Sequence, residues 1–370
     1  LVRSLAIVLV LFRHGQRVAN SPPLGSDWLG HVFLNGWVGV DLFFVLSGYL
    51  IAQHLLRSGL GTQHFTMKRY LVGRAMRIVP AYFAVIALVV IGAFPLFDVN
   101  QTLIIPRMIY HALFLQDYLP SNINIVFWSL GVEAKFYLIA PVLLWVLVSL
   151  RSSGAQIALL LGVAGTATAL RYVDFTAIAD PVSYETFFRS LRSPFHACLE
   201  PLIAGVAISL AQYRGWIKLT EHWGIVFLAG GIVALLGLLA SHEFMADIGL
   251  YDAVAQPIVI AALSGLITLG AVAGKTTRLP FERGFALVSR LSYALYLVHY
   301  PLIPFALFCS HEAGSSLLVF WTVYLATSFL VAWVLHRYVE KPCLEIRDRW
   351  LVRGQQGGAM VRLEARAKQA

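Results

Sequence analysis

The chain has 370 residues, of which 59% are hydrophobic and only 13% are charged, and its mean hydropathy is +0.74. This composition excludes the soluble classes, and continuous apolar runs of about 20 residues exclude an outer-membrane barrel, whose strands alternate over roughly ten residues. The net charge of +9 does not predict nucleic-acid binding, because most basic residues fall between apolar runs, where the positive-inside rule expects them. We predict an all-α, polytopic integral membrane protein that contacts the lipid bilayer and no nucleic acid.

Ten apolar segments are each long enough to cross a bilayer. The stretch 102–118, TLIIPRMIYHALFLQDY, differs because proline, arginine, histidine and aspartate interrupt it. We predict a partial or re-entrant segment there, since a full crossing would place every later basic connection outside. The predicted helix cores are 3–20, 33–56, 76–94, 125–150, 155–172, 194–213, 223–240, 253–273, 285–308 and 315–339.

Basic and acidic connections alternate along the chain in this arrangement, so we predict that the basic connections and both termini face the cytoplasm. Residues 1–345 form the predicted membrane-embedded domain, and residues 346–370 form a basic, polar cytoplasmic tail that we expect to be disordered. No cleavable signal peptide is expected. The basic connections contain Arg57, Lys68, Arg69, Arg74, Arg77, Arg151, Arg214, Lys218, Lys275, Arg278, Arg283 and Arg290, and the acidic ones contain Asp98, Glu243, Asp247, Asp252 and Glu312.

Three cysteines, Cys198, Cys309 and Cys343, lie far apart and form no CxxC or Cys/His spacing. Neither a disulfide framework nor a metal site is therefore predicted, and we interpret the cysteines as packing residues.

Ionisable residues inside predicted spans are candidates for function, because a charge at mid-membrane costs about 2.5–3.5 kcal/mol. Arg3 and His14 are eleven residues apart on the first span, so they share a helix face and lie about 16 Å apart along the axis. Arg3 is predicted at the inner mouth and His14 in the outer half. The alternative for His14 is a helix-end histidine near the lipid headgroups.

Two carboxylates lie about two turns in from the outer side. Asp41, in GWVGVDLFFVLSGYLI, needs a partner or water, while the glycines around it suit close helix packing. Glu133, in FWSLGVEAKFYL, has Ser129 and Tyr137 on its own face at i−4 and i+4. Lys135 points elsewhere, and we expect it to extend toward the membrane interface or to pair with Asp117.

Further polar stripes lie on the sixth and ninth spans. RLSYALYLVHYPLI aligns Ser292, Tyr296 and His299 just before the kinking Pro301. FRSLRSPFHACLEP aligns four polar residues, for which a self-paired helix face is the alternative interpretation. We predict that the outer-half residues line one polar cavity. The four aligned residues are Arg189, Arg192, His196 and Glu200, and the predicted cavity contains His14, Asp41, Glu133, His196, Glu200 and His299.

A basic motif, KRYLVGRAMRIVP, follows the second span. Arg74 and Arg77 form an i,i+3 pair just before Pro80, and such a pair can hold phosphate. The alternative is ordinary basic charge in a cytoplasmic connection. In either case the pair is predicted to lie away from the polar cavity.

Five motifs, in order, now point to a family. They are Arg3-x10-His14, GVDLFFVLSGYLI, RAMRIVP, FWSLGVEAKFYL and LSYALYLVHYP, and together they resemble acyltransferase family three over residues 1 to about 345. Members of this family are integral-membrane acyltransferases that modify bacterial surface sugars. The resemblance implies transfer of an acyl group, commonly acetyl from acetyl-CoA, to a hydroxyl of lipopolysaccharide, another polysaccharide or a related glycan, in the bacterial cytoplasmic (inner) membrane.

The resemblance also implies roles for individual residues. Arg3 and His14 would be the essential pair of the first span, and Arg74 and Arg77 would contact the phosphates of CoA. Glu133 belongs to the signature that begins at Trp128.

The chain departs from the family pattern directly after Glu133. Ala134 and Lys135 stand where a second acidic residue and a glutamine are usual, so we expect the acceptor or the acyl preference to differ. The usual lead-in before Arg3 and the hydrolase-like domain of some members are also absent from this sequence.

We predict O-acyl transfer with His14 as the general base, or alternatively through an acyl-histidine intermediate. Asp41 or Glu133 would orient the imidazole, and no metal takes part. Other polar residues would contact the substrate or stabilise the oxyanion. These tentative substrate contacts are Trp128, Ser129, Arg192, His196, Tyr296 and His299.

Two other functions fit parts of the same pattern. Ten spans with intramembrane carboxylates and histidines also describe a proton-coupled transporter, although no repeated half with paired broken helices is visible. An N-acyltransferase acting on an amino sugar would use the same base. Bound CoA would favour either enzyme, whereas proton-coupled solute uptake into vesicles would favour the transporter.

Overall fold

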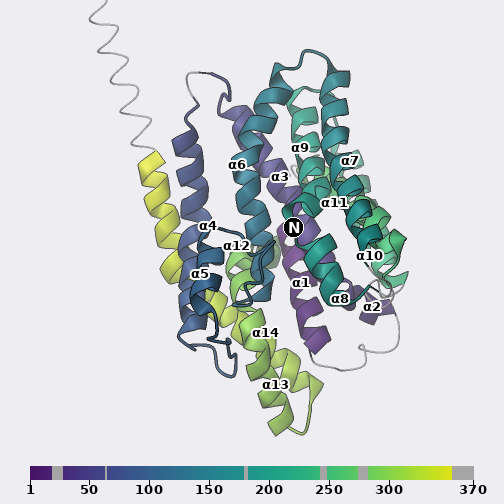
Figure 1. Ribbon diagram of the computed structural model, residues 1–370. Helices are drawn as coiled ribbons and strands as arrows, with labels where there is room; N and C mark the ends of the chain where they lie inside the picture. The colour runs from purple at the N-terminus through teal and green to yellow at the C-terminus, as the bar shows by residue number, and fades with distance from the viewer. Residues whose placement is uncertain (19–27, 63–64, 179–181, 242–247, 274–281, 352–370) are drawn as a thin grey trace, which may run out of the picture.

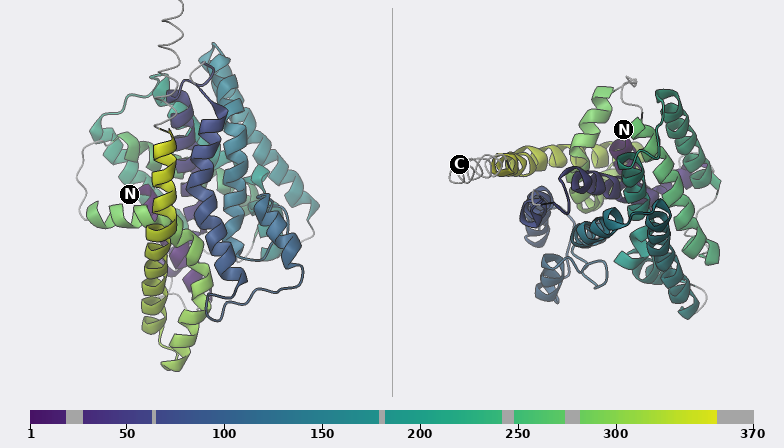
Figure 2. Two further views of the ribbon diagram at one scale, coloured as in Figure 1. Left: turned by 90° about the vertical axis from the view of Figure 1, so that its left-hand side faces the viewer. Right: turned by 90° about the horizontal axis from the view of Figure 1, so that it is seen from above.

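The computed structural model describes residues 1–18, 28–62, 65–178, 182–241, 248–273 and 282–351. Every regular element in these ranges is a helix, and most helices run lengthwise through one elongated bundle (Figures 1 and 2). Four residues of the topology prediction, Glu243, Asp247, Lys275 and Arg278, lie outside the described residues, as does the tail from residue 352.

Fourteen α-helices are found in the described residues. Short 3₁₀ or π-helical turns join several of them, at Gly36–Val38, Ile125–Phe127, Phe188–Arg192, Phe195–Cys198, Tyr251–Ala255, Tyr300–Leu302 and His336–Glu340. The α-helices are α1 (Val2–Val18), α2 (Trp28–Leu34), α3 (Gly39–Arg57), α4 (Met67–Val90), α5 (Ile104–Ala112), α6 (Trp128–Ser149), α7 (Ser153–Ala177), α8 (Tyr184–Phe187), α9 (Leu199–Tyr213), α10 (Glu221–Ser241), α11 (Gln256–Ala273), α12 (Glu282–Val298), α13 (Ile303–Glu312) and α14 (Leu317–Leu335).

Eight helices within the described ranges are long and apolar enough to cross a membrane, and α12 with α13 forms a ninth span bent by 65°. With its 17 residues, α1 is at the lower limit of about 17 residues for crossing. Large apolar side chains such as Leu161, Val233 and Leu330 are more than half exposed, as lipid-facing residues are. The prediction of an all-α polytopic membrane protein is confirmed.

Two local departures from straight spans have clear causes in the sequence. α5 has nine residues and is therefore about 14 Å long, less than half of the roughly 30 Å hydrocarbon core. It lies within the stretch predicted as a partial segment. The bend between α12 and α13 occurs at the turn that contains Pro301, the residue predicted to kink the ninth span.

The helix arrangement brings two of the basic connections to one end of the bundle. The connections from α3 to α4 and from α6 to α7, which contain or adjoin Arg57 and Arg151, lie at the upper end of Figure 1, as does the C-terminal end of the last helix. The turn between α13 and α14 lies at the opposite end. The N-terminus lies at mid-height in both side views (Figures 1 and 2). That the upper end is cytoplasmic stays a prediction.

The core of the bundle is built around α3, which packs against α1, α6, α9 and α11. Its approach to α9 depends on glycine. A Cβ atom at Gly48 would overlap the carbonyl oxygen of Leu202, and one at Gly205 would overlap that of Val45. The packing role predicted for the glycines around Asp41 is therefore confirmed at Gly48, where α3 and α9 pack backbone against backbone.

We expect Gly205→Ala to lower the midpoint of thermal unfolding, because the added methyl group must push α3 and α9 apart, at a cost of about 1–3 kcal/mol. The measurement is intrinsic fluorescence of the protein in nanodiscs during heating. Gly162→Ala is the control, since a Cβ there meets nothing within 4 Å. Equal midpoints for the two variants would contradict the packing argument.

Candidate active site

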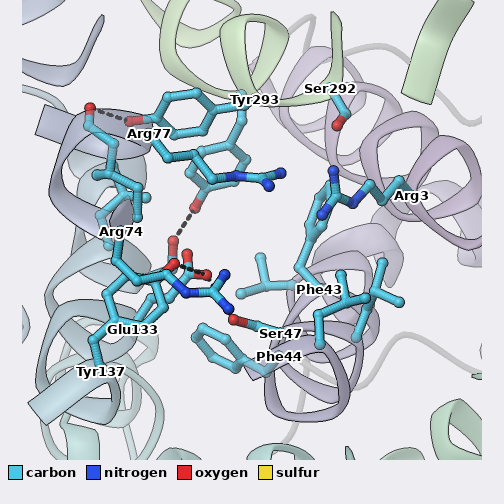
Figure 3. Close-up of a pocket in the computed structure, with 17 residues that line it drawn as sticks. Arg3, Phe43, Phe44, Ser47, Arg74, Arg77, Glu133, Tyr137, Ser292 and Tyr293 are labelled. Atoms are coloured by element: carbon cyan, nitrogen blue, oxygen red, sulfur yellow. Dashed lines mark hydrogen bonds between the residues drawn. The ribbon is translucent and has the colours of Figure 1, made fainter. Parts of the chain in front are cut away.

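An inner cavity of about 100 Å³ lies between α1, α3, α4, α6 and α12. In Figure 3 the guanidinium groups of Arg3, from α1, and of Arg74 and Arg77, from α4, converge on it. Among the described residues that line it, Glu133 of α6 is the single acidic side chain. Three guanidinium groups against one carboxylate make this cavity suitable for an anionic ligand.

Glu133 is held in place by two hydroxyl groups. Its Oε1 accepts hydrogen bonds from Ser47 on α3 and from Tyr137 on α6, both at 2.6 Å (Figure 3). The predicted contact with Tyr137 one turn along α6 is therefore confirmed. These two bonds fix the carboxylate at the edge of the arginine cluster, where it offsets part of the positive charge.

The predicted separation of the arginine pair from Glu133 is wrong, since all three residues line the same cavity. Arg74 and Arg77 lie about 10 and 15 Å along α4 from its first residue, Met67, which places them well inside the bundle. Their long side chains extend further toward α6. Arg74 also lies over the ring of Tyr137, 5.6 Å from its centroid.

His14 lines a second cavity of about 170 Å³ together with Arg13 and Arg17, apart from the arginines of the inner cavity. Its Nδ1 lies 3.0 Å from the carbonyl oxygen of Val10 and 3.2 Å from Nε2 of His299. Since a carbonyl only accepts, Nδ1 of His14 must hold the proton. Nδ1 of His299 likewise donates to the carbonyl of Leu295 at 3.0 Å, which leaves its Nε2 free to accept.

This hydrogen-bonding pattern determines the tautomer of His14. With the proton on Nδ1, the lone pair is on Nε2, and Nε2 has no hydrogen-bond partner in the described part of the chain. Tyr300 packs edge-on against the imidazole with centroids 5.4 Å apart, and the His299 ring lies 5.1 Å away. The arrangement supplies an oriented base without a carboxylate.

The predicted orientation of His14 by Asp41 or Glu133 is therefore corrected. Asp41 accepts a bidentate pair of hydrogen bonds from Arg192, at 2.9 and 2.7 Å, and Glu133 is bound to hydroxyl groups in the inner cavity. A carboxylate that already binds a guanidinium with both oxygens is not available to the imidazole. Val10 and His299 hold His14 instead.

The Asp41–Arg192 pair is buried and enclosed by indole rings. The guanidinium carbon of Arg192 lies 4.8 Å from the ring of Trp37 and 5.2 Å from that of Trp128. Trp128 in turn lines the His14 cavity. Arg192, predicted as a substrate contact, lines neither the inner cavity nor the His14 cavity nor the outer cavity next to it, and instead contacts Asp41 and Trp128.

A hydrogen-bonded partition separates the two cavities. Ser129 and Tyr296 line the inner cavity and bond to each other at 2.6 Å. Tyr296 also donates to the carbonyl of Val126 at 2.6 Å, and Val126 lines the His14 cavity. His299 lies just beyond, with its ring 5.9 Å from that of Tyr296.

The prediction of one polar cavity is wrong. Glu133 and His14 line different cavities, and Asp41 is paired with Arg192. His196 and Glu200 line neither cavity. The helix breaks at Pro194, and each residue finds a partner on another element rather than on its own face. His196 lies 3.2 Å from Asp174 and 3.0 Å from the hydroxyl of Tyr118. Glu200 forms a buried ion pair with Arg171, and the exposed Arg189 pairs with Glu185 at 2.9 Å.

Lys135 behaves as predicted. Its ammonium group lies 2.5 Å from the carboxylate of Asp117 and also bonds to the carbonyl of Phe114. Asp117 belongs to the loop before α6, where burial raises the pKa of its carboxyl and the ammonium of Lys135 opposes that rise.

A third, outer cavity of about 410 Å³ borders the His14 cavity. It was not predicted from the sequence. The two cavities share five wall residues. One signal could have indicated it, namely the amide-rich stretch QDYLPSNIN after the partial segment. The shared wall residues are Ile125, Trp128, Tyr184, Phe188 and Tyr300.

Within the described ranges, no group of three His, Cys, Asp or Glu side chains is placed to hold a metal ion.

We expect Asp41→Asn to destabilise the protein by about 3–5 kcal/mol, because it leaves the buried guanidinium of Arg192 without its counter-charge. The double variant Asp41→Asn with Arg192→Met should be less destabilised than the sum of the two single variants. Thermal unfolding of all four proteins in nanodiscs measures this coupling. Additive effects would show that the pair does not act as a unit.

Comparison with known proteins identifies the family of the chain. A family model for an acyltransferase domain matches residues 1–337. The peptidoglycan O-acetyltransferase OatA of Listeria monocytogenes is 24% identical over 92% of this chain and 54% of its own length. The putative peptidoglycan O-acetyltransferase YrhL of Bacillus subtilis is 27% identical over the same shares, and a putative O-acetyltransferase of Staphylococcus aureus is 29% identical over 39% of this chain and 24% of its own length.

The chain thus spans about half the length of the first two of these relatives. No solved structure matches it. The family match, in contrast, extends over nearly the whole chain and includes all of the motifs from Arg3 to Pro301. The chain therefore belongs to acyltransferase family three.

Proposed function

We propose that this protein transfers an acyl group, in the simplest case acetyl, from acyl-CoA to a hydroxyl of a cell-surface glycan, in the bacterial cytoplasmic membrane. The observation that carries the proposal is the pair of cavities on either side of the Ser129–Tyr296 partition, one lined by Arg3, Arg74 and Arg77 and the other by His14 with Arg13 and Arg17. Relatives named peptidoglycan O-acetyltransferase support acetyl as the group and a glycan as the acceptor.

The donor side is the inner cavity. CoA is anionic through its phosphates, and guanidinium groups bind phosphate through paired hydrogen bonds. Arg3, Arg74 and Arg77 are therefore the residues proposed to bind the donor. The cavity, at about 100 Å³, is smaller than the roughly 300–1,000 Å³ typical of small-molecule sites, so it would hold only part of CoA.

The length of the donor fits the distance between the two cavities. Arg3 and His14 are eleven residues apart on α1, or about 16 Å along the axis. CoA is a long molecule whose thioester lies far from its phosphates. Phosphates bound near Arg3 would therefore leave the thioester able to extend past Ser129 and Tyr296 toward His14.

His14 is the proposed base. Its Nε2 would take the proton from the acceptor hydroxyl as that oxygen attacks the thioester carbonyl carbon. The new carbon–oxygen bond forms, the carbon–sulfur bond breaks, and the imidazolium returns the proton to the leaving thiolate. The products are the O-acyl glycan and free CoA. Val10 and His299 keep Nδ1 engaged throughout, so that Nε2 alone exchanges the proton.

We expect His14→Ala to lower acyl transfer by about 10²–10⁴-fold, the usual contribution of a general base. The measurement is incorporation of radiolabelled acetyl from acetyl-CoA into surface polysaccharide of cells with matched amounts of protein. His311→Ala, which removes an exposed histidine on α13, is the control and should transfer normally. Undiminished transfer by His14→Ala would exclude His14 as the base.

We expect Arg77→Gln and Arg74→Gln each to weaken CoA binding by about 10–100-fold, the loss of one charge-assisted phosphate contact. Isothermal titration of CoA into the protein in nanodiscs gives the dissociation constants. Arg283→Gln, at an exposed arginine of α12, is the matched control. Wild-type protein that binds no CoA but drives proton-coupled uptake into vesicles would favour the transporter alternative.

A further inference from the structure

Beyond the donor and the base, the outer cavity has the properties of a ligand site. It is the largest of the three cavities described above, at about 410 Å³, within the range usual for small-molecule sites. Its wall comes from the loop between α5 and α6, from α8 and the turn that follows it, and from Tyr300 at the bend between α12 and α13. It shares five residues with the wall of the His14 cavity, so a molecule bound there is next to the base.

The charges of the outer cavity cancel. Asp117 pairs with Lys135 at 2.5 Å, and Glu185 pairs with Arg189 at 2.9 Å. The inner cavity differs because its three guanidinium groups outnumber its one carboxylate and leave it with a net positive charge. In the outer cavity the two ion pairs give an anionic ligand no net attraction, and two further cations, Arg13 and Arg17, line the adjoining His14 cavity, so the outer part of the wall favours an uncharged molecule.

The rest of the wall combines aromatic rings with amide and hydroxyl groups. Rings cover the apolar faces of a ligand, while amides and hydroxyls bond to its polar edges. This combination suits a molecule that has both faces and edges of that kind, as a sugar ring does. The rings belong to Phe97, Tyr118, Trp128, Tyr184, Phe188 and Tyr300, and the amides to Gln116, Asn122 and Asn124.

Two wall residues each have an acceptor oxygen that receives no hydrogen bond from the described residues. Gln116 donates its amide hydrogen to the carbonyl of Phe127, but its Oε1 is buried and has no partner in the described part of the chain. The same is true of Oδ2 of Asp117. Because each atom has almost no accessible surface, neither faces the cavity, and the preference of the wall for a sugar rests on its rings and exposed amides.

We infer that the outer cavity is the acceptor site and that it binds an uncharged, hydroxyl-rich stretch of glycan, with Tyr118 against a sugar ring and Asn122 on its hydroxyl edge. This inference rests on the proposed function, because it identifies the acceptor by its position next to His14. Tyr118 is 48% exposed, and Asn122 is exposed with no hydrogen-bond partner among the described residues. The hydroxyl of Tyr118 is bonded to His196, so Tyr118 offers a ligand the exposed part of its ring, while Asn122 offers its whole amide.

The test measures sugar binding separately from chemistry. The fully N-acetylated tetramer of glucosamine, a neutral oligosaccharide, is titrated into the full chain in nanodiscs by calorimetry. We expect Tyr118→Ala to weaken its binding about tenfold and Asn122→Ala about fivefold, by loss of a stacking ring and of one hydrogen bond. Tyr251→Ala, which removes a tyrosine of equal exposure, 48%, should bind as the wild type does.

The outcomes separate the two proposals. No binding of the neutral tetramer, equal binding by Tyr118→Ala, Asn122→Ala and wild type, or tighter binding of tetragalacturonate would overturn the acceptor site. CoA-dependent acetyl transfer is measured on the same preparations. Oligosaccharide binding that weakens as expected, together with no transfer by the wild type, would instead refute the proposed function and leave the sugar site standing.

Discussion

The buried ion pair between Asp41 and Arg192 determines the geometry on which the candidate site depends. It joins α3, the centre of the bundle, to the turn after α8, and its guanidinium group lies between Trp37 and Trp128. Removing two charges from water costs several kcal/mol per ion, which only close, bidentate geometry repays. Because Trp128 lines both the His14 cavity and the outer cavity, this pair positions a wall common to the two.

Hydropathy predicted the spans because a chain in lipid must satisfy its backbone within helices. Helical spacing also predicted near neighbours, such as Tyr137 beside Glu133. One of the two alternatives given for Lys135, a pair with Asp117, is confirmed as well. Helical spacing could not predict which residues on other helices would be partners. Spacing tells which face a residue occupies but not which helix that face meets, and Arg192 finds its partner 151 residues away.

The error over Arg192, His196 and Glu200 has a local cause. The sequence pattern assumes one continuous α-helix, but the chain forms a π-helical turn at Phe188–Arg192 and then breaks before Phe195–Cys198. A π-helical turn takes an extra residue, which rotates later side chains away from the α-helical stripe. Arg192 therefore points to α3, while Glu200 meets Arg171 on α7. The outer cavity was missed for a related reason, since loops that line it have no periodicity.

The buried ion pair and the partition between the two cavities differ in the free energy needed to break them. Asp41 and Arg192 form a buried ion pair whose disruption costs about 3–5 kcal/mol. The partition at Ser129 and Tyr296 rests on neutral hydroxyl hydrogen bonds, each worth a net of about 0.5–1.5 kcal/mol. In the proposed transfer the thioester must pass this partition to reach His14. The cheaper rearrangement is then a movement of the Tyr296 and Ser129 side chains, which breaks these neutral hydrogen bonds while the ion pair keeps Trp128, and with it the acceptor wall, in place.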